Sequence, residues 1–431
     1  MQDLSILSQK QRWAILILML FLSIGYTTQQ AADYRIFVAA GRVMIDEGNN
    51  PYLAEDMVET EPDGIVTPHA QYRYAPIFGI SLYPISLLPK QLYIFLWLFL
   101  NAFLLVKTLM IFREFFPKIL EDNKAFIWVG GISILLCARI IGQNFELGQT
   151  TIILVFLSFY SLYLAKQNKD LLAGLMLSLA IVTKIMPVIL IAYFVYRGNY
   201  KTPLFTILWT ATLVLIPTLF VGWEYNSYLI REWFGIIDPG NSEYTLETKS
   251  GIYNLSAFIY SYFTEMPDDK IQGHRNIMSI PYETAGIITN VVRVAFILLA
   301  LYFTKWNPFK VENDWKQVFY EFGYISLAFP LIFPAQNKYS FYYIIPVLFY
   351  LCVYLYQVTR KEGSIWKVKR SILIPFILYF VLTNLSSANI IGKQLYDLSQ
   401  YYKIMTFGIL ALLITYMQVK PAMLNGYESR D

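Results

Sequence analysis

The sequence contains few charged residues, two cysteines and two histidines. Asp, Glu, Lys and Arg make up 15% of its 431 residues, whereas a soluble domain carries about 25%. Cys137 and Cys352 both lie in apolar runs, where thiols usually behave as small buried hydrophobic groups, so we expect no disulfide. His69 and His274 stand far apart, and no cluster of His, Cys and carboxylates has the spacing of metal ligands. We therefore expect neither a metal site nor a cofactor.

Three other patterns are missing as well. No glycine-rich phosphate loop follows a strand pattern, which excludes a nucleotide-binding domain. The net charge of +4 is small and dispersed, which argues against a nucleic-acid partner. No internal repeat and no low-complexity tail divides the sequence, so we expect one continuous domain over residues 1–431.

Apolar residues, by contrast, are abundant. They make up 56% of the chain, and aromatic residues reach 17%, as expected for a protein that contacts membrane lipids and has aromatic side chains at the interfaces. Since a helix needs about 20 mostly apolar residues to cross a bilayer, the sequence predicts an all-α polytopic transmembrane protein of about twelve segments. Ten stretches are clear candidates: 13–28, 91–112, 125–141, 147–165, 203–222, 284–304, 318–334, 341–358, 372–391 and 404–418. Two more, 76–89 and 171–196, are interrupted by prolines and, in the second, by Lys184.

Basic residues predict the orientation, because cytoplasmic loops carry an excess of Lys and Arg. The basic loops 305–317 and 359–370 are expected inside, and the two largest loops, 29–75 and 223–283, outside. Most of the non-membrane mass then faces the periplasmic side of a bacterial inner membrane. We expect a functional site built from these loops to lie on that side.

Two arrangements of the interrupted stretches are compatible with this orientation. In the first, 76–89 does not cross the membrane, and 171–196 makes two short crossings with Lys184 at the turn. In the second, each stretch crosses once, which moves five basic residues outside: Arg113, Lys118, Lys124, Lys166 and Lys169. The first arrangement agrees better with the positive-inside rule and is favoured.

The first large loop begins with a predicted amphipathic helix. Apolar residues recur at helical spacing over Ala32–Glu47, and the residues from Gly48 to Pro51 supply a stop. We expect this helix to lie along the outer membrane face. Asp33 stands at its start, either as a carboxylate that satisfies exposed amides and the helix dipole or as a catalytic base at the membrane surface. Composition alone favours the first interpretation.

Short motifs follow one another between residues 33 and 190. They are Asp33-Tyr34-Arg35; a turn with Gly48, Pro51 and Tyr52; Tyr74 with Pro76; Asn144 with Gly148-Gln149; and Ala173-Gly174 ahead of Lys184 and Pro187. In order and spacing, these motifs resemble the polyprenol-phosphate-mannose-dependent mannosyltransferases of the glycosyltransferase 87 type, within the GT-C class. In the second half, Asn254-Leu-Ser256 is similar to an Asn-x-Ser element of the family. Where many members have a polar motif with a histidine, this chain reads Pro-Ala-Gln-Asn-Lys-Tyr over residues 334–339.

The resemblance implies an inverting, metal-independent glycosyltransferase with a GT-C-like fold. Its donor would be a polyprenyl phosphate hexose, with mannose expected, and its acceptor a glycan or glycolipid. Asp33 matches the catalytic Asp of the family. Because the donor phosphate is already a good leaving group, transfer needs one general base for the acceptor hydroxyl and groups that stabilise the phosphate. It does not need the two carboxylates of a glycoside hydrolase.

Four basic residues are candidates for binding the donor: Arg35, Arg139, Lys184 and Lys338. Arg139 lies at the end of an apolar span, where a snorkelling role at the interface is favoured over a ligand role. Lys184 lies inside an apolar stretch, where a lysine is costly and usually faces a cavity or a partner. A structural ion pair is the alternative for Lys184, and the binding role is favoured.

A polar connector with Asn144, Glu146 and Gln149 lies between two spans, on the expected outer side with Asp33. Contact with sugar hydroxyls and a purely connecting role are equally compatible with these residues. The rival function is a transporter or flippase of lipid-linked sugars, since transporters often have sites at broken helices, but they also often show internal repeats. A non-catalytic membrane scaffold is a third hypothesis, which leaves Lys184 unexplained.

Overall fold

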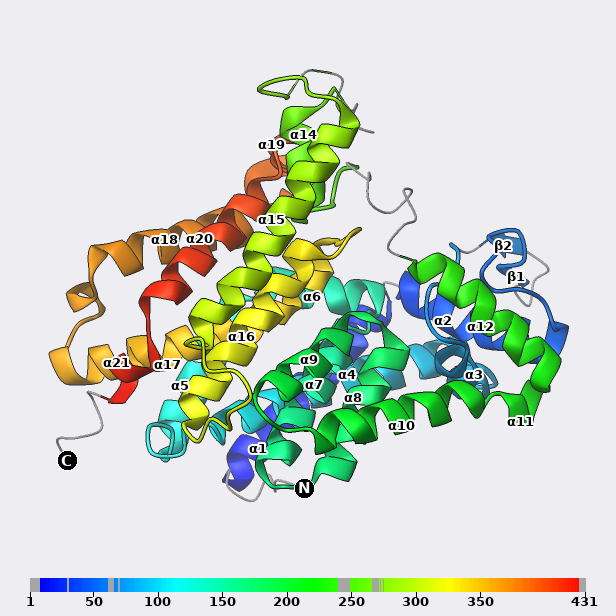
Figure 1. Cartoon of the computed structure of the whole chain (residues 1–431), viewed down its shortest axis with the longest axis horizontal. Coiled ribbons are helices and arrows are strands. Elements are labelled where there is room, and N and C mark those ends of the chain that lie inside the picture. Colours follow the sequence, from blue (N-terminus) through cyan, green and yellow to red (C-terminus); the bar gives the residue numbers. More distant parts are fainter. Residues whose placement is uncertain are drawn as a thin grey trace. The chain divides into compact units, whose positions relative to one another are not determined.

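The computed structural model describes residues 8–28, 31–60, 66–68, 70–238, 249–265, 271, 273 and 275–425. These residues are mostly helical (Figure 1), which confirms the all-α part of the predicted fold class. The helices are α1 (Gln9–Thr27), α2 (Ala32–Arg42), η2 (Val43–Glu47), α3 (Pro76–Ser86), α4 (Lys90–Arg113), α5 (Asn123–Leu136), α6 (Ala138–Leu147), α7 (Thr151–Lys166), α8 (Asp170–Thr183), η3 (Met186–Val188), α9 (Ile189–Tyr196), α10 (Lys201–Leu215), α11 (Thr218–Val221), α12 (Trp223–Ile237), α14 (Leu255–Phe263), α15 (Tyr282–Phe303), α16 (Trp315–Ile332), η4 (Lys338–Ile344), α17 (Ile345–Glu362), η5 (Ile365–Lys367), α18 (Arg370–Phe380), η6 (Val381–Leu385), α19 (Ala388–Tyr401), α20 (Ile404–Gln418) and α21 (Pro421–Asn425). Within the first large loop, β1 (Val58–Thr60) and β2 (Val66–Pro68) form a short antiparallel pair.

The chain forms two compact units. Unit 1 comprises Met1–Ile111, Asn144–Asn241 and Phe309–Val311. Unit 2 comprises Phe112–Gln143, Ser242–Pro308 and Glu312–Asp431.

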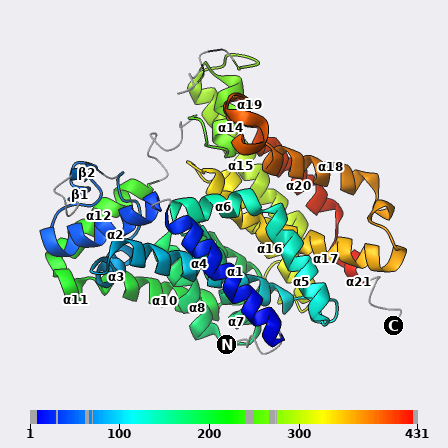
Figure 2. The ribbon, with the colours of Figure 1, turned by 180° about the vertical axis from the view of Figure 1, so that it is seen from behind.

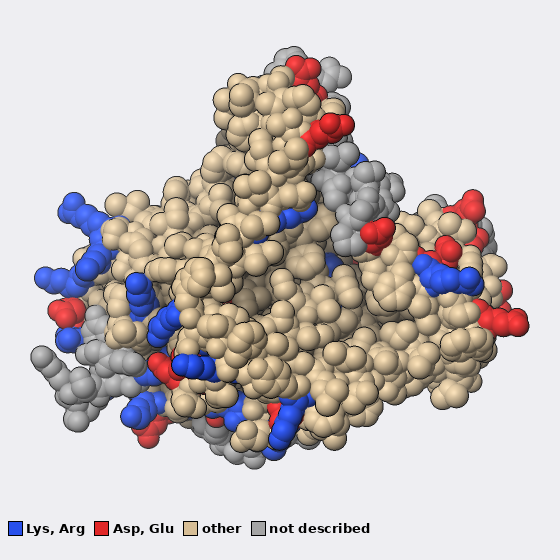
Figure 3. Space-filling model, viewed as in Figure 1, with Lys and Arg blue, Asp and Glu red and all other residues tan. Residues whose placement is uncertain are grey.

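Among the described residues, four helical segments are long and apolar enough to cross a membrane. They are Lys90–Arg113, Lys201–Val221, Tyr282–Phe303 and Lys338–Glu362. Counting three strongly bent helix pairs as one span each raises the number to seven. The other apolar helices are only 10 to 17 residues long, so the expectation of about twelve segments is not confirmed. In Figure 3 the surface over α10 and α15 is almost free of charged side chains, as a lipid-facing surface requires.

In unit 1, α2 and α3 cross at two glycines. A Cβ atom on Gly41 would lie 2.5 Å from the carbonyl oxygen of Gly79, so the close approach of the two backbones needs glycine. The predicted helix 32–47 is present as α2 followed by the π-helix η2, and it ends at Gly48 with φ +67°. Most of α2 is buried, which is more burial than a helix lying freely on a surface has. With 11 residues, α3 rises about 16 Å, roughly half of a bilayer core.

A second group of helices in unit 1 is built from α7, α8, α9 and α10. A Cβ atom on Gly174 would lie 2.6 Å from the Cβ atom of Phe205, and α8 and α10 lie side by side in Figure 1 and Figure 2. The chain leaves α8 at Lys184 and returns through α9. The return is shown by Asn199, which follows α9 and donates a hydrogen bond of 3.0 Å to Asp170 at the start of α8. The stretch 171–196 is therefore a hairpin with Lys184 at its turn, as in the favoured arrangement, and its two membrane crossings stay a prediction.

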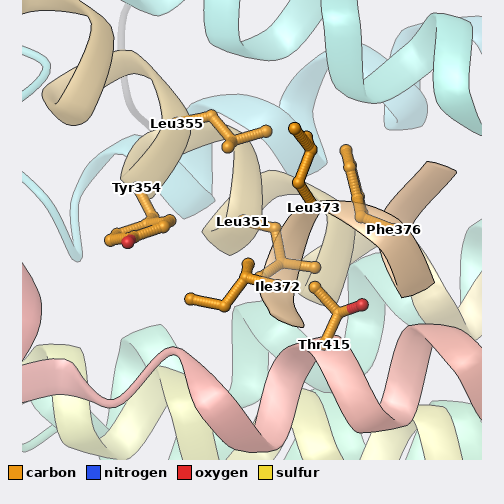
Figure 4. Close-up of a pocket in the computed structure, with 7 residues that line it drawn as sticks. All are labelled: Leu351, Tyr354, Leu355, Ile372, Leu373, Phe376 and Thr415. Carbon is orange, nitrogen blue, oxygen red and sulfur yellow. The ribbon is translucent and has the colours of Figure 1, made fainter. Parts of the chain in front are cut away.

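In unit 2, the core is centred on α17. The most apolar 18 residues of Lys338–Glu362 are 89% buried, so this segment is surrounded by protein. In α15, by contrast, only 11% of the most apolar stretch is buried. Aromatic rings supply much of the packing, with Phe303 stacked on Tyr324 at 4.0 Å between ring centroids. A narrow gap between α17, α18 and α20, too small to hold a water molecule, is lined by Leu351, Tyr354, Leu355, Ile372, Leu373, Phe376 and Thr415 (Figure 4). Because its lining contains no charged side chain, we interpret it as a packing defect.

Candidate functional site

Asp33 lies in the first turn of α2, just beyond the apolar helix α1. Its side chain is partly buried and accepts a hydrogen bond from Nε2 of Gln149. The position suits the helix dipole, but α2 has no side-chain cap hydrogen bond at its N-terminus. The partner of the carboxylate therefore comes from a distant part of the sequence, which a capping role does not require.

The turn at Gly148 brings Gln149 to this carboxylate. Gly148 has φ +66°, and a Cβ atom there would lie 2.7 Å from Cβ of Tyr34 and 2.9 Å from Cβ of Ala31. Trp97 stacks on Tyr34 with 4.3 Å between ring centroids and donates a hydrogen bond of 2.8 Å from Nε1 to the carbonyl oxygen of Gly148. The turn thus packs against Ala31 and Tyr34, the residues on either side of Ala32 and Asp33. Only glycine combines this backbone conformation with so close an approach.

Lys184 is the second charged group of the site. It follows α8 with extended backbone angles, φ −155° and ψ +130°, and its side chain is partly buried. Its positive charge acts on Asp33 and on the exposed Arg73. Burial raises the pKa of the Asp33 carboxyl above its ordinary value, while the hydrogen bond from Gln149 and the charge of Lys184 lower it. The carboxylate is thus stabilised by an amide donor and a cation.

Arg73 was not among the residues that the sequence singled out. The backbone around it is fixed by the turn that follows Gly48, since the amide of Tyr72 donates a hydrogen bond of 3.1 Å to the carbonyl oxygen of Pro51. The hydroxyl of Tyr52 donates another, of 2.8 Å, to the carbonyl oxygen of Tyr74. The only sequence signal for Arg73 was its place directly before Tyr74.

A helix from the second large loop covers this turn in unit 1. Asn50 donates hydrogen bonds of 2.8 Å to the hydroxyl of Tyr228 and 3.1 Å to the carboxylate of Glu232, both in α12. Tyr225 of the same helix donates to the carbonyl oxygen of Asn49. The same helix also contacts α3. Segments from both large loops therefore pack together at the turn that follows Gly48, which was not predicted.

Two other predicted residues lie in unit 1. Asn144 is buried near the end of α6, and its carbonyl oxygen accepts a hydrogen bond of 2.9 Å from the amide of Gln149, so it helps to shape the turn. Arg35 is 8% exposed. Positions two apart in a helix project about 200° apart, which directs Arg35 away from the side of α2 that presents Asp33. Its contact with a donor remains a prediction. Glu146 is exposed.

The remaining two predicted residues, Arg139 and Lys338, belong to unit 2. The guanidinium of Arg139 lies 5.5 Å from the ring centroid of Tyr396, and the ammonium of Lys338 lies 5.9 Å from it. Arg139 also donates hydrogen bonds of 2.6 Å to the carbonyl oxygen of Thr383 and to the hydroxyl of Ser386. These contacts hold the end of the π-helix η6. Asn254, also in unit 2, caps α14 by accepting a hydrogen bond from an amide of that helix.

His69 and His274 lie outside the described residues, so the structure does not test them. Both thiols, Cys137 and Cys352, are buried and free. Within the described ranges, no three His, Cys, Asp or Glu side chains are grouped so that they could hold a metal ion.

The unit 1 residues thus form a carboxylate oriented by an amide, with two cations nearby. Such a group can accept a proton from a hydroxyl while the cations attract an anion. The sequence model of glycosyltransferase family 87 matches residues 72–308, more than half of the chain. The match covers Arg73, Gln149 and Lys184, and it begins after Asp33. No curated protein and no solved structure matches the chain.

Proposed function

The chain belongs to glycosyltransferase family 87, and we propose that it transfers a hexose, with mannose as the first candidate, from a polyprenyl phosphate donor to a glycan or glycolipid acceptor. Its apolar helices are consistent with a membrane protein, the setting in which such a lipid-linked donor is found. The observation that carries the proposal is the hydrogen bond from Gln149 to Asp33 beside the positive charge of Lys184.

The proposed step is a single displacement. The acceptor hydroxyl oxygen attacks the anomeric carbon of the donor sugar, the bond from that carbon to the phosphate oxygen breaks, and polyprenyl phosphate leaves with its electron pair. Asp33 accepts the hydroxyl proton as general base. Gln149 orients the carboxylate through its amide. The configuration at the anomeric carbon is inverted, because one displacement occurs.

Lys184 and Arg73 are the proposed binding groups for the phosphate. Each cation raises the electrostatic free energy of the other, since their charges interact unfavourably. A phosphate between or beside them removes this penalty, and it carries the charge that increases on the leaving oxygen during transfer. Lys184 also stands at the turn of an apolar hairpin, where the cost of the charge favours a bound anion.

Arg139 and Lys338 are retained as proposed contacts for the donor on the part of unit 2 around Tyr396. An aromatic ring offers a face on which a sugar can stack, and the two cations suit a phosphate. The hydrogen bonds of Arg139 to η6 support a second role, that of holding this π-helix, which the sequence did not suggest. We propose that the residues around Asp33 face outside a bacterial inner membrane, as the distribution of basic residues favours.

Sugar transfer by the purified protein in lipid nanodiscs tests this function. Polyprenyl phosphate mannose, polyprenyl phosphate glucose and a nucleotide-linked mannose are supplied in parallel with membrane glycolipids. Transfer from a polyprenyl phosphate sugar, with inversion at the anomeric carbon, is expected. Transfer from the nucleotide sugar alone would contradict the proposed donor class. Transfer of glucose but not mannose would correct the donor sugar and keep the mechanism.

A further inference from the structure

A groove of about 560 Å³ lies in unit 1 where α8 and α10 begin. It is lined by Asn168, Lys169, Asp170, Leu171, Leu172, Lys201, Leu204 and Phe205. The helix α7 leads from the turn with Gln149 to this groove, and its 16 residues rise about 24 Å. The groove is therefore at the opposite end of α7 from Asp33 and is separate from the proposed active site.

The groove combines cationic and apolar side chains. Lys169 and Lys201 are exposed at its rim. Leu171, Leu172 and Leu204 are 50%, 47% and 55% exposed, so its apolar lining is open to whatever surrounds the protein. A soluble ligand of small size gains little from such open apolar contacts, whereas a molecule with both a charged and an apolar part matches both kinds of side chain.

Asp170 is the acidic member of the lining, and its carboxylate is already engaged. Its Oδ1 atom accepts hydrogen bonds of 3.0 Å from Nδ2 of Asn199 and 2.8 Å from the hydroxyl of Thr202. These bonds join the start of α8 to the start of α10. The two lysines leave the lining with a positive charge in excess of this one carboxylate, so it suits an anion.

The position of Lys201 places the groove at the level of lipid headgroups. Lys201 is the first residue of the candidate span Lys201–Val221. Only 11% of the most apolar stretch of this span is buried. The exposed side chains of Ile207 and Leu208 continue the apolar strip along α10. A span of 21 residues is about 32 Å long, which matches a bilayer core of about 30 Å. In a bilayer, this end of the span lies among lipid headgroups.

We propose that the groove binds an anionic phospholipid. The headgroup phosphate pairs with Lys169 and Lys201, and an acyl chain lies against Leu171, Leu172 and Leu204. Because this lipid binds the surface that α8 and α10 form together, it stabilises the folded protein, and the stabilisation grows with the logarithm of the lipid concentration above its Kd. The site rests on the membrane setting of the chain and not on the identity of the transferred sugar.

Native mass spectrometry and thermal unfolding of the detergent-purified protein test this proposal. The probes are dioleoyl phosphatidylglycerol, dioleoyl phosphatidylcholine and inorganic phosphate. Wild-type protein is expected to retain phosphatidylglycerol and to unfold at a higher temperature with it, and to prefer it at least tenfold over phosphatidylcholine. The double variant Lys169→Gln/Lys201→Gln is expected to lose this preference, whereas Lys169→Arg/Lys201→Arg keeps it.

The matched control is Lys361→Gln/Lys367→Gln, which removes the same charge from exposed positions outside the groove and should bind like the wild type. Equal stabilisation by inorganic phosphate would overturn the lipid assignment and leave an anion site. An unchanged preference in Lys169→Gln/Lys201→Gln would overturn the groove itself. If the glutamine variant does not fold, Leu172→Asn replaces it. This variant should bind phosphatidylglycerol more weakly without a change of charge, and wild-type binding of phosphatidylglycerol by Leu172→Asn would count against the proposal. Sugar transfer is not a readout, so failure of the proposed function and failure of this site are distinguishable.

Discussion

The amide of Gln149 donates a hydrogen bond to the carboxylate of Asp33 across a sequence separation of 116 residues. The contact depends on Gly148, whose backbone lies against Ala31 and Tyr34 on either side of the α2 start. A Gly-Gln pair and an Asp that are far apart in the sequence are thus parts of one structure. A hydrogen bond to a charged group is typically worth about 1.5–3 kcal/mol, enough to fix the direction of the carboxylate.

Gly148→Ala should lower both stability and transfer activity. A methyl group there would overlap Cβ of Tyr34 at 2.7 Å, and φ +66° is strained for alanine. Backbone strain of this kind costs about 1–3 kcal/mol, and displacement of Gln149 should lower kcat by on the order of tenfold or more. Thermal unfolding and initial rates of transfer measure the two effects. Gly131→Ala is the control, because no atom lies within 4 Å of a Cβ at that position. Equal behaviour of the two variants would show that the turn does not position Gln149.

Lys184→Met should weaken donor binding and shift the pH profile. Loss of a charge-assisted contact with phosphate should raise the KM for the donor on the order of tenfold to a hundredfold. The sign of the pH effect follows from Asp33: the charge of Lys184 lowers the pKa of this carboxyl, so its removal raises the pKa. Since a general base acts in its ionised form, the rate should fall away at a higher pH than in the wild type.

Lys184→Arg is the matched control for this change, since it keeps the positive charge. It should keep the position of the acidic limb, even if the donor KM changes because the guanidinium is larger. A Lys184→Met protein that folds, binds the donor normally and has the wild-type pH profile would exclude Lys184 from the site.

Much of the local structure could be predicted from the sequence. The helix over 32–47 and its end at Gly48 followed from apolar spacing and a glycine that tolerates positive φ. The hairpin at Lys184 was favoured because it keeps the basic residues of the neighbouring loops inside, as the positive-inside rule requires. The helix depends on interactions between close neighbours in sequence, and the hairpin on the placement of charges in the loops.

Features that depend on tertiary packing could not be predicted. The expected span 125–141 bends by 69° between α5 and α6, and the expected span 372–391 divides into α18, η6 and α19 with a bend of 92°. Hydropathy averages over such breaks and does not locate them. The position of Arg73 near Lys184 could not be predicted either. It depends on hydrogen bonds that join residues 51 and 52 to residues 72 and 74, on either side of Arg73.

Cysteine labelling tests the orientation of the chain. Glu55 and Glu362 are both exposed, and the native thiols are buried, so background reaction is low. In intact spheroplasts, an impermeant maleimide should label Glu55→Cys and should label Glu362→Cys only after lysis. The expectation follows from the basic loop at 359–370. Labelling of Glu362→Cys alone in intact spheroplasts would reverse the proposed orientation and place Asp33 on the cytoplasmic side.

Asp33→Asn should abolish most of the transfer activity and leave the fold intact. Asparagine has nearly the same size, and its side-chain oxygen can still accept the hydrogen bond from Gln149. It cannot accept the hydroxyl proton at working pH, and loss of a general base typically costs on the order of 10²–10⁴ in rate. Single-turnover transfer from polyprenyl phosphate mannose, with thermal unfolding measured in the same preparation, separates a catalytic effect from a structural one.

Burial raises the pKa of the Asp33 carboxyl, so wild-type activity should fall as the pH drops through that raised pKa. The residual activity of Asp33→Asn should not follow this fall. The matched control is Asp46→Asn, the same substitution in the adjoining π-helix, where the carboxylate is exposed and accepts a hydrogen bond of 2.6 Å from Tyr83. This control should retain activity within a few-fold of the wild type. If a stable Asp33→Asn protein turns over as fast as Asp46→Asn, Asp33 is not the base. Another group must then accept the proton, and the exposed Glu146 is the first to be substituted.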